Sequence, residues 1–315
     1  MRSFSPRLVL SKDLHPLFAE QIAEVRATPG FYQAIRLHAD ATRISGSYGA
    51  DAATYAKHIG DAGNQLIELV ALYQHLLKER SNIGVGATLG RLQKTAFIHG
   101  FASPRRVTMY VKRLVQIGRL GYSEEAGDRR VRRLIPGEDL VMAAFRNTQH
   151  SVRAADLIWQ SQLGERLQSD TNFFDMLFVA KYQRYVAGAD PLRPFSDVRH
   201  FTSKDAGSYL LGSLIYGALE NAEKLSPETE FTLGYSDASA ASGVSRTHVR
   251  NVIETAEKLG LVIRIGEGGR AMRLTERMID SYERCFACAM ILVRAAANDV
   301  EAQEVQEPVP PNGDS

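Results

Sequence analysis

The side chains best suited to chemistry in this chain are cations gathered in two short segments. Between Ser103 and Gln116 there are four Lys or Arg residues and no acid. A second segment begins at Ser245 and carries two Arg residues, a His and, at its end, Asn251. Guanidinium groups can pair with guanine edges, and an Asn amide can pair with adenine. These residue types on a helix are typical of proteins that read the major groove of DNA.

In both segments apolar residues recur at helical spacing. They are Val107, Val111, Leu114 and Ile117 in the first, and Val249, Val252, Ile253, Ala256 and Leu259 in the second. Ser103 and Ser245 are good N-cap residues, and Gly118 and Gly260 are suited to end a helix. Each segment is therefore predicted to be a helix with one buried face and one exposed, mainly basic face.

The surrounding elements also occur in the same order twice. A helix is predicted over Leu89–His99, and a shorter one over 238–242, each followed by a glycine suited to a tight turn. After each basic helix a β-hairpin is predicted, the first over 120–134 and the second over 261–275. The order is helix, turn, capped helix, glycine and hairpin.

The chain matches itself at a nearly constant shift, which indicates an internal duplication. Phe31-Tyr32 pairs with Phe173-Phe174, and Ser103 pairs with Ser245, at a shift of 142 positions. Asp61-Ala62-Gly63 pairs with Asp205-Ala206-Gly207 at a shift of 144. The predicted domains are 1–137, with the first helix-turn-helix unit at about 66–135; 138–297, with linking helices, the second unit at about 210–275 and a C-terminal helix; and a disordered acidic tail, 298–315.

Both units resemble winged helix-turn-helix transcription factors of the MarR-like kind. The resemblance rests on the stretch from Leu114 to Leu120, which ends Gly-Arg-Leu, on the matching stretch from Ala256 to Leu261, and on Leu274-Thr275 after the second hairpin. The first unit departs from the family pattern at Ile135-Pro136. The resemblance implies a mainly α fold with small β wings, present as a tandem duplication that forms an intramolecular pseudo-dimer.

We predict that the outward residues of the two basic helices and of the two wings contact DNA. In the first unit these are Ser103, Arg105, Arg106, Thr108, Met109, Lys112, Arg113, Arg129, Arg130, Arg132 and Arg133. In the second unit they are Ser245, Arg246, Thr247, His248, Arg250, Asn251, Arg270 and Arg273. The formal charge of +2 includes five acids in the predicted tail, so the remainder is more basic than the total indicates.

These observations predict a sequence-specific transcriptional regulator that binds double-stranded DNA, either as a monomeric pseudo-dimer or as a homodimer. The resemblance also implies a possible small-molecule effector. We expect a cytoplasmic, bacterial-type protein without a membrane span. Two alternatives remain open: a plasmid-type replication initiator with tandem winged helices, and a winged-helix scaffold for protein partners.

Other candidate sites are interpreted as structural. The pair Cys285 and Cys288 lies in an apolar predicted helix, where two thiols cannot complete a zinc site. The two cysteines are interpreted as small buried residues, with a redox switch as the alternative. His58 and His200 occupy equivalent positions and are interpreted as packing or capping residues. The aromatic residues Phe31, Tyr32, Trp159, Phe173, Phe174, Tyr182 and Tyr185 are interpreted as core, with an effector pocket as the alternative. No catalytic motif is found, so we expect no enzyme activity, no cofactor and no metal.

Overall fold

The computed structural model describes residues 16–44, 61–81, 85–123, 132–266 and 271–306. Over these residues the protein is mainly helical, with thirteen helices and two small antiparallel sheets, as the sequence predicts. No helix in these ranges is long and apolar enough to cross a membrane.

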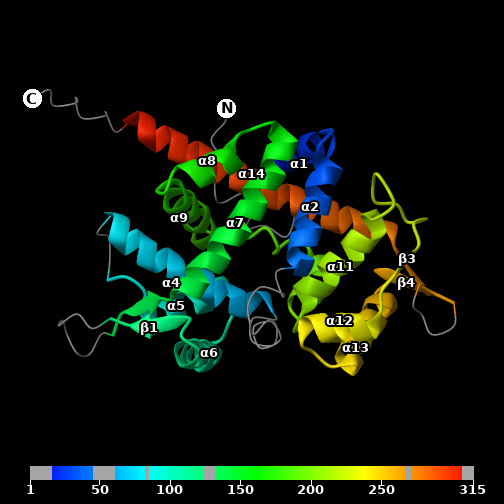
Figure 1. Cartoon of the computed structure of the whole chain (residues 1–315), viewed down its shortest axis with the longest axis horizontal. Helices are drawn as coiled ribbons and strands as arrows, with labels where there is room; N and C mark the ends of the chain where they lie inside the picture. The colour runs from blue at the N-terminus through cyan, green and yellow to red at the C-terminus, as the bar shows by residue number, and fades with distance from the viewer. Residues whose placement is uncertain (1–15, 45–60, 82–84, 124–131, 267–270, 307–315) are drawn as a thin grey trace, which may run out of the picture.

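The elements of the first half appear again, in the same order, in the second half (Figure 1). The first half contains α1 (Pro16–Arg26), α2 (Phe31–Ile44), α4 (Ala62–Ser81), α5 (Leu89–His99), α6 (Pro104–Gln116), β1 (Leu120–Tyr122), β2 (Leu134–Pro136) and α7 (Glu138–Trp159). The second half contains α8 (Leu163–Ser169), α9 (Phe173–Val186), α10 (Ser196–Thr202), α11 (Gly207–Leu219), β3 (Phe231–Thr232), α12 (Tyr235–Ser242), α13 (Arg246–Lys258), β4 (Val262–Ile265), β5 (Ala271–Leu274) and α14 (Glu276–Gln306).

The short helices begin and end where local sequence signals place them. The hydroxyl of Ser103 accepts a hydrogen bond from the backbone N–H of Arg106 at 3.2 Å and so caps α6. The hydroxyl of Ser245 caps α13 through the N–H of His248 at 3.1 Å. Gly100 and Gly243, both at φ +68°, end α5 and α12 in the left-handed conformation that glycine adopts without strain.

A β-hairpin follows each capped helix. In the first, β1 pairs with β2 in antiparallel register, with Tyr122 opposite Leu134. In the second, β4 pairs with β5, with Val262 opposite Leu274, and β3 joins the other edge of β5. At the place in the first half that corresponds to β3 there is an isolated bridge, Thr88 with Arg133.

The two halves exchange helices across a shared core. Helix α2 packs against α11 of the second half, and its counterpart α9 packs against α4 of the first. In the same way α1 packs against α14, while α8 packs against α7. The aromatic residues at matching positions, Phe31 and Phe173, are both fully buried in this core. The interpretation of the aromatic set as core is confirmed for these two and for Phe174, Tyr182 and Tyr185.

The exchanged helices support two lobes, the first of residues 61–136 and the second of residues 207–274. In Figure 1 α5, α6 and β1 of the first lobe lie at the lower left of the molecule, and α12 and α13 of the second lobe lie at the lower right. Helices α6 and α13 lie at the same lower edge, and the two hairpins lie at opposite outer sides.

The prediction of a disordered tail is wrong for residues 298–306, which continue α14 as far as Gln306. The cause is packing that is distant in sequence. Val300 is fully buried, Asp299 accepts two hydrogen bonds from Arg184 at 2.6 and 2.7 Å, and Glu304 pairs with Arg166. Residues 307–315 lie outside the described residues.

Candidate nucleic-acid interface

Helix α6 is held against the first lobe by its apolar face, and it presents a basic face outward. Val107, Val111 and Leu114 are buried, whereas Arg105 and Lys112 are exposed. Because the buried positions recur at helical spacing, the side chains between them must share the opposite face.

A buried polar contact fixes α6 on α4. Glu68 accepts a hydrogen bond from the hydroxyl of Tyr110 at 2.6 Å and another from the guanidinium of Arg119 at 2.5 Å. All three side chains are buried. No local sequence pattern predicts this cluster, because Glu68 lies 42 residues before Tyr110.

Two predicted DNA contacts instead bind protein groups at or just before the start of α4 and of α11 in their own lobes. Arg106 forms an ion pair with Asp61 and donates hydrogen bonds to Asn64 at 2.9 and 3.0 Å. At the matching place in the second lobe, a ring nitrogen of His248 lies 2.9 Å from the backbone oxygen of Asp205. Both contacts fix the first turn of the basic helix, and both side chains keep some exposure.

The other predicted positions on α6 differ in exposure. Thr108 is half-buried: its hydroxyl donates to the backbone oxygen of Pro104 at 3.0 Å and accepts from the amide of Gln93 at 2.8 Å. Met109 is 64% exposed, and Arg113 is half-buried. Of the contacts predicted on the middle of this helix, Arg105, Met109 and Lys112 are thus exposed.

Among the described residues, two of the three hairpin cations predicted to contact DNA are paired within the protein. Arg133 forms an ion pair with Glu79 at 2.7 Å, and Arg273 forms one with Glu230. Arg132 is exposed, and its guanidinium lies 3.8 Å from the centre of the Tyr122 ring. The predicted contacts Arg129, Arg130 and Arg270 lie outside the described residues.

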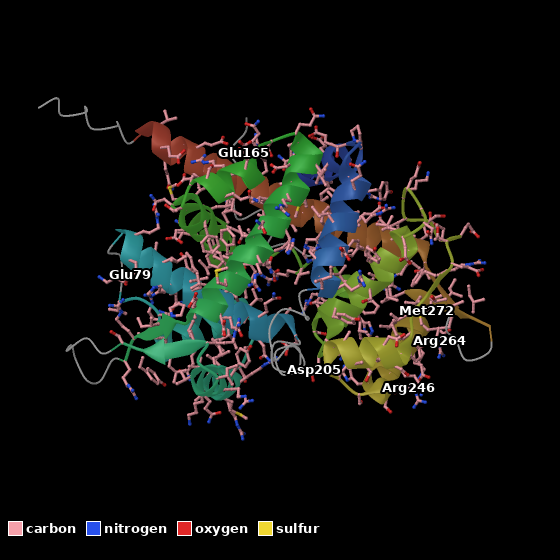
Figure 2. The ribbon with its side chains drawn as sticks, viewed as in Figure 1. Glu79, Glu165, Asp205, Arg246, Arg264 and Met272 are labelled. Carbon is pink, nitrogen blue, oxygen red and sulfur yellow. The ribbon has the colours of Figure 1, made fainter. Side chains whose placement is uncertain are left out.

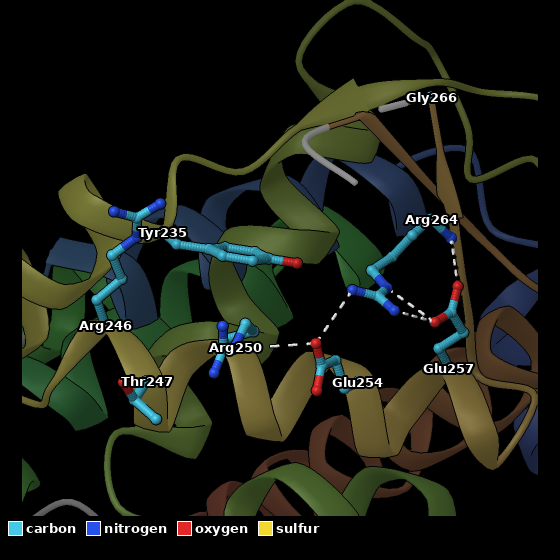
Figure 3. Close-up of a pocket in the computed structure, with 8 residues that line it drawn as sticks. All are labelled: Tyr235, Arg246, Thr247, Arg250, Glu254, Glu257, Arg264 and Gly266. Carbon is cyan, nitrogen blue, oxygen red and sulfur yellow. Dashed lines mark hydrogen bonds and ion pairs between the residues drawn. The ribbon is translucent and has the colours of Figure 1, made fainter. Parts of the chain in front are cut away.

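Helix α13 presents a face of mixed charge. Arg246, Thr247, Arg250 and Asn251 are exposed, as predicted for a reading helix, and Arg246 lies near the outer surface of the second lobe (Figure 2). Beside them runs a groove of about 760 Å³ between α13, the start of α12 and β4. It is lined by Tyr235, Arg246, Thr247, Arg250, Glu254, Glu257, Arg264 and Gly266 (Figure 3).

The far end of the groove holds an ion-pair network that the sequence analysis did not identify. Arg264 of β4 lies 2.6 Å from a carboxylate oxygen of Glu257 and 3.5 Å from one of Glu254. Hydrogen bonding from Arg264 lowers the pKa of Glu257 below its ordinary value. Arg250 lies 3.9 Å from Glu254 on the other side. The alternating charges on α13 are visible in the sequence. The sequence does not show, however, that Arg264 on β4 contacts them.

The remaining sequence candidates are packing residues. Cys285 and Cys288 are buried within α14, and burial raises the pKa of both thiols, that of Cys288 to about 12. His200 packs edge-on against Phe201, with a ring nitrogen 3.3 Å from the backbone oxygen of Val252. The packing interpretation is thus confirmed for His200, whereas His58 lies outside the described residues.

No family model, curated protein or solved structure matches this chain.

Proposed function

We propose that this protein is a sequence-specific transcriptional regulator that binds double-stranded DNA through two winged helix-turn-helix units. In this proposal α6 and α13 are the recognition helices, and the two hairpins are the wings. The order of elements in both lobes supports it, since a short helix, a glycine turn, a serine-capped helix and a hairpin follow one another in each.

The units are proposed to descend from one duplicated segment and to act as a pseudo-dimer. The reciprocal contacts of α2 with α11 and of α9 with α4 support this idea, because an isologous dimer makes each of its contacts twice. Joining the units in one chain with a shared core holds the recognition helices at one separation.

The observation that carries the proposal is the position of the exposed cations. Arg105 and Lys112 on α6, and Arg246 and Arg250 on α13, are exposed on helices that lie along one edge of the molecule (Figure 1). Two recognition helices on one side of a protein match successive major grooves on one side of a duplex.

The test is selection of bound duplexes from a random library by the purified full chain, with affinity then followed against salt. We expect one enriched site of ~15–25 base pairs and a log affinity that falls linearly with log salt. The double variant Arg105→Gln, Lys112→Gln should bind every duplex more weakly. Its salt slope should be shallower by about one for each phosphate that the variant no longer neutralises.

Arg153→Gln is the control, because it removes a cation from an exposed position on α7. It should bind like the unmodified chain. Absence of any enriched site and of salt-dependent binding would contradict the regulator proposal.

One observation favours the scaffold alternative. Phe97 and Ile98 at the end of α5 are 72% and 63% exposed, whereas the residues at the same distances from the glycine that ends α12 are Ala240 and Ala241. Exposed apolar side chains of this size are common at protein contacts. A chain that folds but shows no salt-dependent DNA binding in the selection would support this alternative.

A further inference from the structure

The two proposed recognition helices carry opposite charges at one matching position. Glu254 of α13 stands where α6 has Lys112, given the shift of 142 residues that aligns Ser103 with Ser245. On the rest of its outward face α13 resembles α6 in offering cations and hydrogen-bonding groups. The carboxylate of Glu254 on this face therefore requires a physical explanation.

Glu254 lies on the outward stripe of α13. Thr247, Arg250, Asn251 and Glu254 follow at steps of three and four residues, so they line up along one side of the helix. Val249, Val252 and Ile253 on the opposite side are buried. Glu254 and Arg250 also line the groove beside β4, in which Figure 3 shows the carboxylate between two guanidinium groups.

The carboxylate is held in place without being covered. One oxygen lies 3.5 Å from Arg264 and 3.9 Å from Arg250, and the side chain keeps 35% of its exposure. Arg264 is itself directed toward α13 by its shorter contacts with Glu257, at 2.6 and 2.8 Å. Two long contacts leave the Glu254 carboxylate with capacity for further donors, because a carboxylate can accept about four hydrogen bonds.

A carboxylate at a DNA interface interacts differently with the phosphates and with each of the base edges. It repels phosphate, so it weakens binding to the backbone. On base edges in the major groove it accepts a hydrogen bond from the N4 amino group of cytosine, whereas adenine is matched better by the amide of Asn or Gln. On α13 that amide is supplied by Asn251, three residues away. Cytosine is thus the partner that fits Glu254.

We propose that Glu254 is a specificity-determining residue, which accepts a hydrogen bond from the N4 amino group of a cytosine in the half-site read by α13. Arg250 and Arg264 orient its carboxylate. This inference rests on the proposed function and deepens it. It also assigns different tasks to the two units: α6 contributes electrostatic affinity, and α13 contributes base selection.

The test repeats the duplex selection with the full-length chain and with Glu254→Gln. For the unmodified chain we expect one C·G pair whose replacement weakens binding roughly 5- to 150-fold, the usual range for one good base contact. In Glu254→Gln that preference should fall to within about twofold, while the other preferred positions remain. Binding to unrelated duplexes should be unchanged or tighter, because a negative charge has been removed.

Glu223→Gln is the charge-matched control, because Glu223 is exposed in the same lobe but lies outside α13. It removes one negative charge and should retain the cytosine preference. Thermal unfolding of each variant shows whether it is folded. If Glu254→Gln were unfolded, Glu254→Lys, which copies the residue of α6, would replace it and should lose the same preference.

The inference is overturned if folded Glu254→Gln keeps an unchanged set of preferred bases, or if the site selected by the unmodified chain contains no such C·G pair. In either case DNA binding itself would persist, with its salt dependence. Failure of the proposed function is a different result, in which the unmodified chain enriches no duplex and binds none in a salt-dependent way.

Discussion

Asp197 of α10 forms side-chain hydrogen bonds with two residues of α14. Its carboxylate accepts hydrogen bonds from Arg277 at 2.6 and 2.9 Å and from the hydroxyl of Ser281 at 3.0 Å. Burial disfavours its charged form, but the hydrogen bonds and charge of Arg277 outweigh burial and lower the pKa of Asp197. The folded protein therefore binds a proton at Asp197 less readily than the unfolded chain does.

The lowered pKa predicts a dependence of stability on pH. The stabilisation from Asp197 is fully present above the pKa of the unfolded carboxyl, about 3.9, and is lost as pH falls through the lower folded value. At pH 7 we expect Asp197→Asn to lower the free energy of unfolding by about 1–3 kcal/mol. Urea titrations from pH 7 to 3 should show this difference shrinking below pH ~4. Glu20→Gln, at an exposed position of α1, should show no such difference.

Residue types alone could predict which helix faces are basic, but not which cations are already paired. Arg105 and Lys112 are exposed as predicted, whereas Arg106, Arg133 and Arg273 each form an ion pair within the protein. The partner of Arg106 lies 45 residues away in the sequence. No local pattern specifies such a contact, because it depends on how α4 packs against α6.

Among the elements, the helices with capping serines were the most predictable. The serine side chain satisfies an N–H that the first turn leaves without a helical partner, and this signal lies within a few residues of the helix start. Helix α6 accordingly begins just after Ser103, and α13 just after Ser245. Helix α12 begins at Tyr235, three residues before the prediction, because its N-cap is Gly234 and no side chain marks the start.

The caps predict a modest loss of stability that is equal in both units. Ser103→Ala and Ser245→Ala should each lower the free energy of unfolding by about 1 kcal/mol, since each leaves one backbone N–H of the first turn without its acceptor. Urea unfolding followed by circular dichroism measures the loss. Ser236→Ala, at an exposed position within α12, is the control and should change stability by less than about 0.5 kcal/mol. A loss in only one of the two cap variants would contradict the equivalence of the units.

At the scale of the whole molecule, the sequence repeat predicted the order of elements but not their exchange between halves. The self-match aligns Phe31 with Phe173, and both are buried as an alignment of like residues requires. Yet α2 packs on α11 and α9 on α4, as well as on α7 and α14 of their own halves, so each half contributes a helix to the core of the other. A self-match cannot predict whether helices are exchanged between the halves, because an exchanged and an unexchanged arrangement have the same sequence.

The exchange has a consequence for the proposed DNA complex. Because both lobes share one core, a single chain carries both proposed recognition helices, and under the proposed function it should fill two half-sites without a second copy. We expect one chain per selected duplex in a mass measurement of the complex. Arg105→Gln, Lys112→Gln should weaken protection of one half-site, and Arg246→Gln, Arg250→Gln that of the other. Two chains per duplex, with both half-sites sensitive to the α6 variant alone, would show that α6 of separate chains reads the DNA and that α13 has another task.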